Sequence, residues 1–105
     1  MIAFETYRSH DGLALAELVR RGEMSAVELL DAAIGAAERI NPTVNALSQR
    51  LYEEARASLA HVEKRAPFAG LPFLLKDVST AMKGTRTMQG SRLFPDAPWR
   101  RSIPP

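Results

Sequence analysis

The 105-residue sequence contains no cysteine, only two histidines and no long apolar run. Without cysteine the chain can form neither a disulfide framework nor a thiolate metal site. His10 and His61 are far apart in sequence and have no carboxylate spacing typical of metal ligands, so we expect no metal and no organic cofactor. An apolar run long enough to span a bilayer is missing, and residues 1–5 lack the basic flank and apolar stretch of a secretion signal. We therefore expect a cytoplasmic protein without a membrane association.

Composition is otherwise that of a soluble globular protein, with 46% hydrophobic and 25% charged residues. The net charge of +2 is unevenly distributed, because five basic residues against one acid lie in residues 81–105. Such a segment can bind phosphates, but its basic residues are scattered and only Phe94 and Trp99 could stack on bases. We expect no nucleic-acid partner. An alternative is a small helical module that binds nucleic acid through its basic C-terminal quarter, in which case replacing Arg100 and Arg101 by Ala would weaken salt-dependent binding.

Two helices are predicted in the first 42 residues. The first covers residues 12–21, with Asp11 as its N-cap and Gly22 where helices commonly stop. The second begins after Ser25, which forms a capping box with Glu28.

The second helix is expected to end at Asn41, because the next residue is a proline. Residues 44–48 could be a short strand or an extended linker. A third helix is predicted over residues 51–65, and residues 71–75 have the length and bulk of a buried strand. This order of elements predicts an α/β fold in which helices cover a sheet.

Lys76 directly follows the predicted strand, where a chain emerges from a core. Partial desolvation there lowers the pKa of a lysine and makes it usable as a base. The alternative is a solvated ion pair with the adjacent Asp77, which would contribute little. Small and polar residues that could approach a substrate closely follow the lysine, namely Ser79, Thr80, Gly84, Thr85, Thr87, Gly90 and Ser91.

Four segments between about Leu13 and Pro98 resemble the N-terminal region of the amidase signature family. They are residues 25–30 (SAVELL), residues 40–46 (INPTVNA), residues 70–77 (GLPFLLKD) and the loop formed by Gly84, Thr87, Gly90 and Ser91. Each pattern is weak alone, but four in order are specific together. Residues 73–77 and 90–94 further resemble the family members near 6-aminohexanoate cyclic-dimer hydrolase.

The resemblance implies an α/β fold with a mixed sheet covered by helices, and hydrolysis of a small-molecule carboxamide through a Ser–cis-Ser–Lys triad. In that scheme one serine attacks the carbonyl, a second bridges it to a neutral lysine, and water releases the acyl group. Lys76 matches the catalytic lysine of the family. Ser91 matches a loop that shapes the site without attacking the substrate, and Ser79 has no implied role.

The family's Gly-Ser-rich stretch, which supplies both serines and the oxyanion amides, has no counterpart in this sequence. Residues 1–98 are therefore expected to be the N-terminal portion of an amidase domain, and residues 99–105 an irregular tail outside the pattern. A truncated or frameshifted gene product would have this form. Such a fragment would carry an incomplete sheet and would be inactive alone. It could also self-associate through the exposed edge of that sheet.

Two further alternatives remain open. The chain could be part of the amidotransferase subunit that acts on misacylated tRNA, which has the same fold. It could also be a non-catalytic fragment that associates with an intact homologue.

Overall fold

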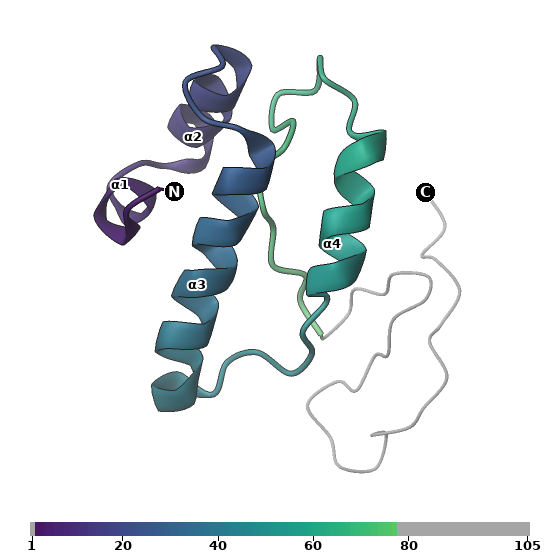
Figure 1. Cartoon of the computed structure of the whole chain (residues 1–105). Coiled ribbons are helices and arrows are strands. Elements are labelled where there is room, and N and C mark those ends of the chain that lie inside the picture. The colour runs from purple at the N-terminus through teal and green to yellow at the C-terminus, as the bar shows by residue number, and fades with distance from the viewer. Residues whose placement is uncertain (1, 78–105) are drawn as a thin grey trace. The chain divides into compact units, whose positions relative to one another are not determined.

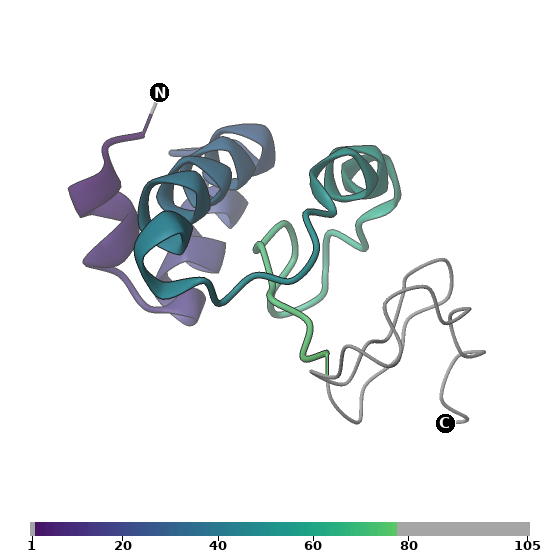
Figure 2. The same ribbon diagram turned by 90° about the horizontal axis from the view of Figure 1, so that it is seen from below.

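The computed structural model describes residues 2–77 and divides the chain into two units, Met1–Pro72 and Phe73–Pro105. The described part of the first unit is helical. Its elements are α1 (Phe4–Arg8), α2 (Gly12–Arg20), α3 (Ala26–Val44), α4 (Tyr52–Ser58) and the 3₁₀ turn η1 (Leu59–His61). Helices α1 and α2 lie on one side of α3 and α4 lies on the other, as two perpendicular views show (Figures 1 and 2).

The starts of α2 and α3 confirm Asp11 and Ser25 as the N-cap residues. The Asp11 carboxylate accepts a hydrogen bond from Ala14 N at 2.8 Å, and the Ser25 hydroxyl accepts one from Glu28 N at 3.0 Å. Each cap satisfies an amide that has no partner within the first helical turn. Gly22 follows α2 with a φ of 76°, a left-handed conformation that glycine adopts without strain.

The predicted end of α3 is wrong, because the helix continues past Pro42 to Val44. A proline removes one helical hydrogen bond and its ring crowds the carbonyl one turn earlier, and two residues before the end of a helix this disturbance affects only the last turn. The helix ends instead at Asn45, which has a φ of 49° and donates its N–H to Asn41 O at 2.6 Å. Residues 45–51 are irregular, which makes them a linker and not a strand.

The third predicted helix is shorter than expected, since its α-helical part ends at Ser58 and η1 ends at His61. It has no side-chain N-cap and no buried residue, so little opposes fraying. Helix α1 was not predicted, because five residues are too few to show a periodic pattern. The Arg39 guanidinium lies 4.7 Å from the centre of the Phe4 ring and connects α1 to α3.

The core lies among α1, α2, α3 and the chain that returns after η1. Leu15, Met24 and Leu29 are buried at its centre. The partly buried side chains packed against them are Ile2, Tyr7, Leu18, Val19 and Leu71. None of these residues comes from α4, which therefore lies outside the core.

The predicted buried strand over residues 71–75 is wrong for the part of the chain that the structure describes. These residues are irregular, and Phe73 and Leu74 are 84% and 74% exposed. A strand requires a partner for its backbone N–H and C=O groups, and residues 2–77 contain no other strand to supply one. Several expected helices are confirmed, whereas the sheet, its edge and the α/β class stay predictions.

No helix within residues 2–77 combines the length and the apolar character that crossing a membrane requires.

Candidate functional site

The segment that leads to Lys76 is a compact double turn over residues 66–72. Ala69 N donates to Ala66 O at 3.1 Å, and Leu71 N donates to Phe68 O at 3.0 Å. These local bonds satisfy backbone groups without a sheet. They give the chain a defined path after η1.

Gly70 lets this double turn approach α2 and α3 closely. It has a φ of 81°, and a Cβ at this position would lie 3.0 Å from the Cβ of Ala26 and 3.4 Å from Cγ1 of Val19. A side chain at this position therefore faces backbone strain and a tight contact that requires Ala26 to shift by a few tenths of an ångström. The next residue, Leu71, packs against the core.

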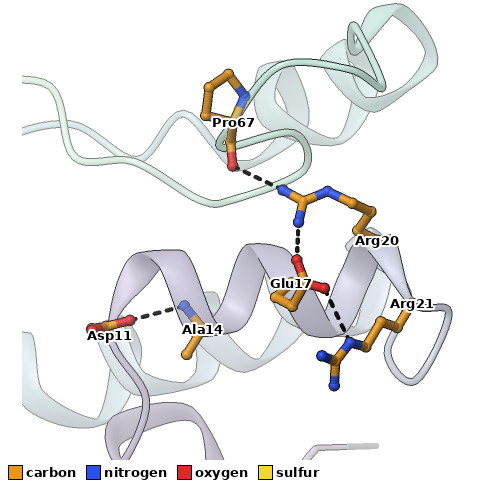
Figure 3. Close-up of polar contacts among 6 residues, drawn as sticks. All are labelled: Asp11, Ala14, Glu17, Arg20, Arg21 and Pro67. Atoms are coloured by element: carbon orange, nitrogen blue, oxygen red, sulfur yellow. Dashed lines mark hydrogen bonds and ion pairs between the residues drawn. The ribbon is translucent and has the colours of Figure 1, made fainter.

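Arg20 connects α2 to the same turn at Pro67 (Figure 3). Its guanidinium donates to Pro67 O at 3.5 Å and pairs with the Glu17 carboxylate. Glu17 also accepts from Arg21 Nε at 3.0 Å. Residues 66–72 are thus held by the packing of Leu71 against the core and by the polar contact of Arg20 with Pro67 O.

Lys76, the predicted catalytic lysine, lies in the second unit, in irregular chain, and is exposed. Leu75 before it is 39% exposed. The sequence placed Lys76 at the end of a buried strand, and residues 2–77 do not provide that environment. Ser79, Ser91 and the basic pair Arg100 and Arg101 lie outside the described residues, so the roles of all these residues stay predictions.

The two histidines are not brought together. His10 Nδ1 lies 2.7 Å from Thr6 O, a local contact at the end of α1, and His61 is exposed in η1. In the described range no three His, Asp or Glu side chains group closely enough to hold a metal ion.

A polar cluster that the sequence did not predict joins α3 to the start of α4. Arg50 Nε donates to Glu38 Oε1 at 2.7 Å, and the Tyr52 hydroxyl donates to the same oxygen at 2.6 Å. The hydrogen bonds from Tyr52 and Arg50 lower the pKa of the Glu38 carboxyl, and the bond to Glu38 raises the pKa of Tyr52. Partners 12 and 14 residues apart leave no short-range signal in a sequence.

Known proteins resemble most of this chain. Residues 28–100 match a family model described as Amidase. The 6-aminohexanoate-cyclic-dimer hydrolases of Pseudomonas sp. (strain NK87) and Paenarthrobacter ureafaciens are each 45% identical over 74 residues, which is 70% of this chain and 15% of each relative. A glutamyl-tRNA(Gln) amidotransferase subunit from Deinococcus deserti is 42% identical over 87 residues, which is 77% of this chain and 17% of that protein.

The chain therefore spans about 15% of the length of the curated hydrolases that it matches. No solved structure matches it significantly.

Proposed function

Because the chain belongs to the amidase family, we propose that it takes part in hydrolysis of a carboxamide C–N bond, with Lys76 as the base of a Ser–cis-Ser–Lys triad. The observation that carries this proposal is the family match over residues 28–100, which includes Lys76. The motif around the lysine, GLPFLLKD at residues 70–77, agrees with the family pattern. The 45% identity to two hydrolases of a cyclic amide favours an amide substrate of small size.

In the proposed reaction a serine hydroxyl attacks the carbonyl carbon of the amide and forms a tetrahedral adduct. The proton of the attacking hydroxyl passes through the second serine to the neutral amine of the lysine. The lysine then supplies a proton to the departing amine. Water hydrolyses the resulting acyl-enzyme and releases the carboxylic acid. Lys76 is exposed in the described structure and would have to become buried for this role, since desolvation favours the neutral form of an amine.

We propose that these 105 residues alone do not hydrolyse amides. Only Ser79, Ser91 and Ser102 follow Lys76, and none lies in a Gly-Ser-rich stretch like the one that supplies the family's serines. Loss of a nucleophile removes nearly all activity of a triad. The lysine therefore needs serines from additional amidase sequence.

A chimera tests the role of the lysine. The segment of the Paenarthrobacter ureafaciens hydrolase that matches this chain would be replaced by this chain's own residues, and hydrolysis of 6-aminohexanoate cyclic dimer measured. We expect an active chimera in which Lys76→Ala lowers kcat by on the order of 10³-fold or more.

Lys64→Ala is the matched control, because Lys64 is exposed in the described structure and lies outside the motif. It should leave kcat within about twofold. Comparable activity of the Lys76→Ala and Lys64→Ala chimeras, with both proteins folded, would exclude Lys76 as the base.

The 42% identity to the Deinococcus deserti amidotransferase supports a second candidate, in which the same triad releases ammonia for transfer to glutamyl-tRNA. The two candidates differ in the fate of the nitrogen: the hydrolase leaves it as a free amine, whereas the amidotransferase releases ammonia and passes it to glutamyl-tRNA. A matching chimera built on the Deinococcus deserti protein would be assayed for glutamine hydrolysis. Activity in that chimera, together with none on the cyclic dimer in the first, would favour the amidotransferase.

A further inference from the structure

Two carboxylates on one face of α3 bind the part of the chain that carries α4. Asp31 and Glu38 are separated by about two helical turns, so they lie on the same side of α3. Asp31 Oδ1 is 2.7 Å from Nη1 of Arg56, within α4. Glu38 Oε1 accepts from Arg50 and from Tyr52, at the start of α4. Helix α4 is therefore tied to α3 near both of its ends.

The apolar contacts of α4 lie outside the buried core cluster of the described structure. Neither α4 nor η1 contains a buried residue, and the core cluster of the described structure includes none of their side chains. Leu51, Ala55 and Leu59 are partly buried, and none of them reaches the core cluster. A helix as short as α4, without a side-chain cap, is not stable in isolation. Its helical state depends on its contacts with α3.

We propose that α4 is a separately releasable segment, held to α3 by Asp31 and Glu38, which salt, acid or alkali detaches while α1, α2 and α3 stay folded. This inference is independent of amide chemistry. Segments of low stability that open before the core are common in proteins, and they are marked by few buried apolar contacts.

Sensitivity to salt follows from the exposure of the ion pairs. The side chains of Arg50 and Glu38 are 51% and 47% exposed, and those of Arg56 and Asp31 are 42% and 53% exposed. Mobile ions screen such half-exposed pairs. The contacts among Leu15, Met24 and Leu29 are apolar, so added sodium chloride does not weaken them in the same way.

Sensitivity to pH follows from the groups around each carboxylate. Arg50 from the linker and Tyr52 from α4 face Glu38, and Arg56 from α4 faces Asp31, whereas Arg39 lies over Phe4 on α1. The pKa of Glu38 is lowered from its ordinary value of 4.5. Glu38 therefore stabilises the attachment of α4 fully at a pH above 4.5, and this stabilisation is lost as the pH falls through the lowered pKa.

The raised pKa of Tyr52 gives the opposite limit. Tyr52 stabilises the attachment of α4 fully at a pH below its ordinary pKa of 10.0, and this stabilisation is lost as the pH rises through the raised pKa. Attachment of α4 is therefore strongest between about pH 4.5 and pH 10, the two ordinary values.

Hydrogen–deuterium exchange of the intact 105-residue chain tests the proposal, with separate peptides for residues 52–58 and 26–44. At about pH 7, raising sodium chloride from about 50 mM to about 1 M should accelerate exchange of residues 52–58 by about threefold to tenfold. Exchange of residues 26–44 should change by less than about twofold.

Variants identify the groups responsible. Glu38→Gln should accelerate exchange of residues 52–58 at low salt by about threefold to tenfold and reduce the further effect of salt. Glu23→Gln removes the same charge from the turn between α2 and α3, and it should leave the exchange of residues 52–58 within about twofold. Tyr52→Phe keeps the ring and removes one bond to Glu38, so it should have an intermediate effect.

Two results would overturn the proposal. Joint acceleration of residues 52–58 and 26–44 in the salt series would show that α4 belongs to one cooperative unit with α3. Unchanged exchange of residues 52–58 in salt would show that the ion pairs do not hold α4. If Glu38→Gln unfolds the whole chain, the salt series on the unaltered chain still shows whether residues 52–58 open separately from residues 26–44.

Discussion

At the scale of single residues, Gly70 controls how closely residues 66–72 approach α3. Its left-handed φ of 81° is costly for any residue with a Cβ, and the nearest atom, Ala26 Cβ, would lie only 3.0 Å away. Gly70→Ala should lower the free energy of unfolding by about 1–3 kcal/mol, because strain and overpacking act together. Urea unfolding followed by circular dichroism measures this change.

Gly35→Ala is the matched control, since Gly35 lies within α3 and a Cβ there would meet nothing within 4 Å. It should raise the free energy of unfolding by about 0.5–1 kcal/mol, because alanine favours a helix interior over glycine. Equal effects of the two substitutions would mean that residues 66–72 are not packed against α3 as described.

At the scale of elements, the end of α3 depends on Asn41, which is buried although polar. Its side-chain oxygen accepts from Leu47 N at 2.9 Å, and its backbone oxygen accepts from Asn45 N. Asn41→Ala should lower the free energy of unfolding by about 1–3 kcal/mol, because the Leu47 amide loses its partner. Thermal or urea unfolding measures this free energy. The control is Thr43→Ala, because Thr43 is exposed in the same turn, and it should change the free energy of unfolding by less than about 0.5 kcal/mol.

Elements set by neighbouring residues could be predicted, and those set by distant contacts could not. The caps at Asp11 and Ser25 act over three residues, so the local sequence located the starts of α2 and α3. The end of α3 is an exception, because it too is set by nearby residues: the helix accommodates Pro42 and ends at Asn45, which has a left-handed conformation.

The candidate site was predicted only in part for the same reason. The lysine motif can be read in sequence, but burial of residues 71–75 depends on partner strands that residues 2–77 do not contain. The cluster of Glu38, Arg50 and Tyr52 joins residues that only the folded chain brings together.

At the scale of the whole molecule, the exposed apolar run Phe73, Leu74 and Leu75 predicts self-association of the 105-residue chain. Contiguous exposed apolar side chains favour association, because contact between molecules removes them from water. Substituting both Phe73→Ser and Leu74→Ser should lower the weight-average mass that sedimentation equilibrium gives at about 100 µM protein. The control combines Leu13→Ser and Val44→Ser, which are 62% and 58% exposed but lie on separate helices, and should lower the mass less. A chain that is monomeric at this concentration and unfolds cooperatively would contradict the prediction, because its exposed run would then have no energetic consequence.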